Sequence, residues 1–250
     1  MALISFEDLA ALDDEQLDDD DITDSSEPMD DENEDRLLAH WQAVGRTHHV
    51  SVPREMTAPI AEMTRRNQET EREPVPYSVI SKREKLGDVI EERLYPAGKW
   101  ACITKSEKMY EQSISLAFMQ LMRFICKESS AGKYLGMTVP VLAEFQLTES
   151  GTDFMKDVVT AYYLPAQYQS NPPQPNDPEI TISHRGPMRV ITHVFYGTTT
   201  EETVQRQIQL LWESLGEMEN VHRHNYMVAT YENPGVPGRR NEIWFIRTDQ

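Results

Sequence analysis

Histidine is the side chain in this sequence that most readily binds a metal or moves a proton near neutral pH, and the chain has seven. His222 and His224 would share one side of an expected strand, but no cysteine or third histidine lies at metal-site spacing. His48 and His49 lie in an acidic segment, where a weak metal contact is feasible and no preformed site is expected. The histidines therefore predict no metal centre.

Motifs for covalent catalysis or phosphate binding are also missing from the sequence. It contains no Gly-rich phosphate loop, no nucleophile elbow and no paired-cysteine metal motif. Cys102 and Cys126 make no disulfide framework, so both are expected to be buried thiols in a reducing compartment. These observations favour a binding protein over an enzyme. An enzyme that acts on a small apolar ligand is a third possibility, with no support beyond a possible pocket.

A helix predicted at residues 108–127 carries apolar residues on more than one face. Its core stripe consists of Tyr110, Ile114, Ala117, Phe118, Leu121 and Ile125. The opposite face carries Leu116 and Met119 near Arg123, and Met122 lies between the two faces. A Met-rich apolar patch beside a cation suits a flat ligand that carries carboxylates. Alternatively, the loop at residues 127–137 folds over this face and makes it core.

The strands that must position this helix follow from alternating apolar residues. They are expected at residues 77–81, 89–95, 99–105, 139–147, 157–164, 179–185, 188–196, 226–232 and 242–248. A second helix is expected at residues 201–215, with Gly216 as its stop. Both halves thus have the order strands, helix, strand pair. We predict an α+β fold in which a duplicated strand-helix-strand-strand unit forms a distorted antiparallel β-barrel flanked by two helices.

Charge separates the N-terminal part of the chain from the rest. Residues 1–35 hold sixteen Asp or Glu residues and no Lys or Arg, which leaves 26 of the 42 acidic residues to face 24 basic ones. We therefore predict two parts, a mostly disordered acidic arm at residues 1–72 and one domain at residues 73–250. Apolar islands at residues 3–12 and 37–44 of the arm predict transient helices or a docking peptide for a protein partner.

Four segments carry a resemblance to a known family. They are EERLYPAGKW (residues 91–100), GMTVPV (136–141), YYLPAQYQSNPPQPND (162–177) and GRRNEIWFIRT (238–248). In this order and spacing they resemble the SOUL haem-binding protein family, over essentially all of residues 73–248. The resemblance implies a duplicated α+β barrel, haem or protoporphyrin binding in a cleft beside the first helix, and no enzymatic activity.

The resemblance also suggests individual ligand contacts. Leu116, Phe118, Met119, Met122 and Arg123 are the expected porphyrin-binding residues, with Arg123 facing the propionates. Some members place a histidine, proposed as an iron ligand, at the position of Leu94, so no strong axial ligand is expected here. A basic residue that other members carry shortly before GRRNE is missing, and either Arg239 or Arg240 is available to replace it.

Together these features predict a non-enzymatic tetrapyrrole carrier or buffer that binds haem or protoporphyrin reversibly. The alternative is a protein-interaction scaffold with a degenerate haem site, which contacts partners through the acidic arm. No apolar run reaches the ~20 residues of a membrane-spanning helix, and no basic surface for nucleic acid is evident. We expect a cytoplasmic monomer that binds neither membranes nor nucleic acid.

Overall fold

One large antiparallel sheet dominates the computed structural model, which describes residues 31–69, 72–85, 88–151, 153–216, 220–233, 236 and 238–248. Nine strands in these ranges form the sheet in the order β2-β3-β9-β11-β10-β6-β7-β4-β8. Their bounds are β2 (Ser78–Lys85), β3 (Asp88–Tyr95), β4 (Gly98–Lys105), β6 (Val141–Gln146), β7 (Val158–Tyr163), β8 (Thr181–Arg185), β9 (Met188–Tyr196), β10 (Val221–Thr230) and β11 (Arg240–Arg247). Short β1 (Glu73–Pro74) and β5 (Thr138–Val139) pair separately. The α+β class is confirmed.

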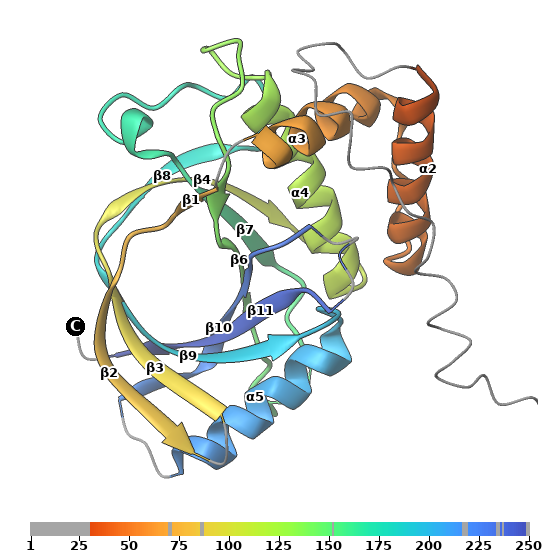
Figure 1. Ribbon diagram of the computed structural model, residues 1–250. Helices are drawn as coiled ribbons and strands as arrows, with labels where there is room; N and C mark the ends of the chain where they lie inside the picture. Colours follow the sequence, from red (N-terminus) through yellow and green to blue (C-terminus); the bar gives the residue numbers. More distant parts are fainter. Residues whose placement is uncertain are drawn as a thin grey trace, which may run out of the picture.

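The sheet curls strongly but does not close into a barrel (Figure 1). Its edges, β2 and β8, pair only with β3 and β4, so the barrel prediction is wrong for the described strands. Charged residues in the second half of β2, Lys82, Arg83 and Glu84, are typical of a sheet edge that stays unpaired. Val79 and Ile80 in its first half are exposed as well.

Both halves of the sheet have the same internal pairing order. The first half pairs as β4-β7-β6 and the second as β9-β11-β10, and β6 joins β10 in the middle. Because this similarity concerns connectivity alone, a duplicated ancestral unit stays a prediction.

Helices α4 (Tyr110–Cys126) and α5 (Glu201–Leu215) lie on the outside of the curl (Figure 1). Both were predicted, and Gly216 ends α5 with a φ of 68°, which favours glycine. Inside the curl, Tyr95 and Trp244 are almost fully buried, and an Arg93–Glu242 ion pair has an N–O distance of 2.9 Å. The side chains of the sheet itself therefore fill its interior, and a ligand is better sought beside the helices.

The N-terminal segment, defined here as residues 31–69, is folded rather than disordered. It comprises α2 (Asp31–Thr47), the short helix η1 (Arg54–Met56) and α3 (Thr57–Glu69). Met56, Ile60 and Met63 are buried in a core cluster that they share with residues of α4, and α3 lies beside α4 (Figure 1). The structure thus differs from the expected disordered arm over these residues, because they bury enough apolar surface to offset the cost of ordering them. The island at residues 3–12 lies outside the described residues.

Candidate functional site

A cavity lies between α4, the rim of the sheet and the N-terminal segment. Its volume is about 100 Å³, measured as the space open to the centre of a water molecule. The first half of α4 supplies Ile114, Phe118 and Met119, and α2 supplies Trp41 and Val44 from the opposite side. We call this space the inner cavity. Its wall is mainly apolar, which is typical of small-molecule sites.

His48 is the polar residue that links the two sides of the inner cavity. It follows α2, is 6% exposed, and has its ring Nδ1 2.7 Å from Ser115 Oγ on α4. Burial, and then the nearby charge of Arg239, lower the pKa of His48, so the imidazole is neutral near pH 7. With the proton on Nδ1 donated to Ser115, the lone pair of Nε2 remains available.

Arg239 supplies a buried cation at the same cavity. Its side chain is only 5% exposed, and one guanidinium nitrogen donates to Thr199 Oγ1 at 3.3 Å. Burial lowers the pKa of Arg239, although a guanidinium stays charged in proteins. Tyr110 Oη and Thr160 Oγ1 also lie in the wall and have no hydrogen-bond partner among the described residues. Such buried polar atoms indicate that water or a ligand occupies the space.

A second space, the outer hollow, adjoins the inner cavity. It has a volume of about 390 Å³ and opens between α2 and the turn before β11. Val44, His48 and Arg239 line both spaces and thus form the partition between them. The outer hollow alone lies in the usual range of ligand pockets, about 300–1,000 Å³, whereas the inner cavity is smaller.

Only two of the five sequence-predicted site residues line the inner cavity, Phe118 and Met119. Met122 is 1% exposed and belongs to the core that α4 shares with the N-terminal segment. Leu116 is half-buried and lies outside the cavity wall. Both α3 and the loop at residues 127–137 contribute to the core cluster that contains Met122, the loop through Leu135 and Met137.

Arg123, the expected propionate partner, is engaged elsewhere. Its Nε donates to Glu128 at 2.8 Å, and its Nη1 lies 3.6 Å from Glu55 in η1. The hydrogen bond that Arg123 donates to Glu128 raises the pKa of Arg123, as expected for a cation with acidic neighbours. Arg123 is absent from both the inner cavity and the outer hollow.

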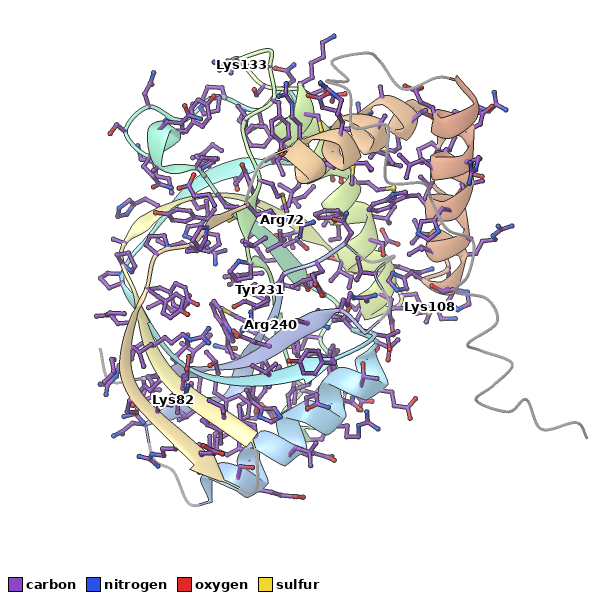
Figure 2. All side chains as sticks on the ribbon, in the orientation of Figure 1. Arg72, Lys82, Lys108, Lys133, Tyr231 and Arg240 are labelled. Carbon is purple, nitrogen blue, oxygen red and sulfur yellow. The ribbon has the colours of Figure 1, made fainter. Side chains whose placement is uncertain are left out.

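Between the two alternative arginines the structure makes a clear distinction. Arg240 donates to Glu242 and lies over the Tyr231 ring at 4.2 Å, whereas Arg239 lines the cavity. Figure 2 shows Arg240 and Tyr231 near the middle of the view together with Arg72, which also lines the cavity and donates to the Tyr231 carbonyl. Leu94, on β3, does not line the cavity.

Sequence reasoning missed the contribution of the N-terminal segment. Trp41, Val44 and His48 recur at helical spacing, which would place them on one face of a helix. That signal was available, but the surrounding acidic residues outweighed it in the prediction of a disordered arm.

Comparison with known proteins identifies the family. The model of the SOUL heme-binding protein family matches residues 72–246. This chain belongs to the SOUL family. Among its relatives, Heme-binding protein 1 of Xenopus laevis is 31% identical over 172 residues, which cover 68% of this chain and 90% of the frog protein. Heme-binding protein 2 of Homo sapiens is 26% identical over 160 residues, covering 63% and 78% of the two chains.

The SOUL match begins at residue 72, so the N-terminal segment lies outside it. Trp41, Val44 and His48 are therefore additions to the family domain. A solved structure of an uncharacterized conserved protein from Listeria innocua covers 63% of this chain and 90% of its own, with a TM-score of 0.37 and 12% identity. That likeness is too low to indicate function. Among the described residues, no helix is long and apolar enough to cross a membrane.

Proposed function

We propose that this protein is a non-enzymatic, cytoplasmic tetrapyrrole carrier or buffer that binds haem or protoporphyrin reversibly beside α4. The observation that carries the proposal is the mainly apolar inner cavity with a buried arginine in its wall. The relatives' names, Heme-binding protein 1 and 2, support the same ligand class. A haem supplies a flat apolar ring with two carboxylates, and the cavity wall has the chemistry to match both.

Named residues of this chain would hold such a ligand. Phe118 and Met119 on α4, with Trp41 on α2, offer apolar and polarisable contacts for the ring. Arg239 would pair with a propionate, and burial would strengthen that charge-assisted hydrogen bond. Met122 and Arg123 would act indirectly, since their contacts hold α4 and the N-terminal segment together. Leu116 does not line the inner cavity and would not touch the ligand there.

A direct test is titration of haemin, and separately of metal-free protoporphyrin IX, into the protein at micromolar concentration. We expect a saturable shift of the haemin Soret band and a saturable increase in protoporphyrin fluorescence. An unchanged spectrum with both ligands would contradict the proposed function.

Arg239→Gln tests where the carboxylates bind, with Arg240→Gln as the matched neighbour. Loss of a hydrogen bond to a charged group costs about 1.5–3 kcal/mol, so affinity for protoporphyrin should fall about 10- to 100-fold. The Arg240 variant should bind like the wild type, because its side chain interacts with Glu242 and Tyr231.

Esterified protoporphyrin completes this test, since its propionates carry no charge. Its affinity should be the same for the wild type and Arg239→Gln. Equal losses with the free acid and the ester would mean that the substitution disturbs the cavity and not a carboxylate contact.

A further inference from the structure

We infer that His48 is an axial ligand for the iron of a bound haem, and that the N-terminal segment thereby completes the binding site. This inference rests on the proposed function and extends it to a residue outside the matched family domain. It concerns a position different from Leu94, which does not line the cavity.

The position of His48 supports this role. His48 lines both the inner cavity and the outer hollow, so a ligand in either space can reach its ring. Phe118 and Met119 line the inner cavity, and Arg239, like His48, lines both spaces.

The hydrogen bond to Ser115 prepares His48 for metal binding. Metal-ligating histidines usually donate the other ring N–H to a nearby acceptor, which fixes the tautomer and the ring orientation. Here Nδ1 lies 2.7 Å from Ser115 Oγ, and the tautomer that carries its proton on Nδ1 leaves a lone pair on Nε2. Coordination through Nε2 would use its lone pair and release no proton from a neutral imidazole.

Packing of the turn after α2 also restricts where His48 can go. A Cβ at Gly45 would lie 2.9 Å from both the Val50 carbonyl oxygen and a Val52 methyl group, so this turn packs tightly on the end of α2. Gln112 Nε2 donates to the His49 carbonyl at 3.2 Å, a second link between the turn and α4. A histidine held from two sides loses little conformational entropy when it binds a metal.

Met119 is the competing ligand in the same wall, since a thioether also binds haem iron. Its side chain packs in the core cluster that α4 shares with the N-terminal segment. His48 is preferred because a hydrogen bond orients its ring and neutral imidazole is the commoner iron ligand.

The experiment compares haemin with metal-free protoporphyrin IX in the full-length wild type and in His48→Ala, because only haemin offers iron to an axial ligand. We expect His48→Ala to weaken haemin binding at least about tenfold. It should change the protoporphyrin affinity less than about twofold, a result that also shows that the cavity is still folded. The electronic and electron paramagnetic resonance spectra of bound ferric haem should lose the signature of a nitrogen ligand, and added imidazole should restore it.

Two further variants serve as controls. His184→Gln removes an exposed histidine from β8 and should leave both ligands and the spectra unchanged. Met119→Leu keeps the apolar volume and should leave the nitrogen signature in place.

Several results would overturn the inference. Equal haemin binding and spectra in the wild type and His48→Ala would exclude His48 as the ligand. Equal losses of haemin and protoporphyrin would make His48 a wall residue only, and a spectral change confined to Met119→Leu would assign the ligand to Met119. A wild type that binds neither ligand would overturn the proposed function and the role of His48 with it.

Discussion

Helices α4 and α5 lie on the outside of the two halves of the sheet. The outer face of α4 is covered by protein, whereas that of α5 is largely exposed. Nine of the 17 residues of α4 are buried, against four of the 15 residues of α5. The outer face of α5 carries Leu210 at 43% exposure, whereas α3 covers the second half of α4. The extra apolar face of α4 is therefore where the N-terminal segment packs.

The apolar face of α4 has two different surroundings along its length. Met122 and Cys126, near the C-terminal end, pack with the N-terminal segment, while Ile114 and Phe118, nearer the start, line the inner cavity. The N-terminal segment thus packs on one end of α4 and forms a cavity wall at the other.

The largest expected effect concerns the contact between α3 and α4. Ile60 is 1% exposed and packs in the shared core, so Ile60→Ala should lower the free energy of unfolding by about 2–5 kcal/mol. Leu210→Ala on the outer face of α5 should change it by no more than about 0.5 kcal/mol. Urea unfolding followed by circular dichroism measures both. Equal effects of the two substitutions would remove the distinction between the helices.

A smaller effect is expected in the chemical reactivity of Cys126, at the end of α4. Its Sγ donates to the Pro59 carbonyl of α3 at 3.5 Å, and burial raises the pKa of the thiol to about 12. In a Cys102→Ala background, Cys126 should react very slowly with a thiol reagent at pH 8, because the thiolate is scarce and covered.

Adding Ile60→Ala should speed that reaction at least about tenfold, since local opening of the N-terminal segment exposes the thiol. Leu210→Ala should leave the rate unchanged. If neither substitution alters the rate, Cys126 becomes exposed only by global unfolding, and the segment does not open on its own.

How much the sequence could predict depended on the range of the interactions. Strand alternation and the helical stripe of α4 are local patterns, and the structure confirms both helices of the domain. Closure of the sheet depends on whether β2 and β8 meet, which no local pattern encodes. The α3 helix was missed because Met56, Ile60 and Met63, although at helical spacing, stand among polar residues.

The site was predictable only in part for a similar reason. Phe118 and Met119 follow from the helix face, but Arg123 is held by Glu128 and by Glu55, the second of which only the fold brings near. Arg239 and Arg240 are neighbours in sequence, so composition alone gave no reason to choose between them. His48 lies in the cavity only because the fold brings the turn after α2 against α4.

The smallest expected effect is a pH dependence of the free energy of unfolding. It arises at His48, which contacts the covered helix α4, and has no counterpart on the outer face of α5. Burial, and then Arg239, lower the pKa of His48 below its ordinary value of 6.5, so the unfolded chain binds a proton more readily than the folded one. Stability should therefore decrease as the pH falls below 6.5, with a slope no steeper than about 1.4 kcal/mol per pH unit for one proton.

His48→Gln should remove this dependence between pH 7 and pH 5, as measured by urea unfolding across that range. The carboxylates of Glu62 and Glu91 do not confound it, because their lowered pKa values place their loss of stabilisation below the ordinary value of 4.5. His184→Gln, on the exposed edge strand, should keep the pH dependence of the wild type. The same slope in the wild type and in His48→Gln would mean that His48 binds protons equally well in the folded and unfolded chain. The contact between the turn after α2 and Ser115 would then contribute no pH sensitivity to the covered side of the molecule.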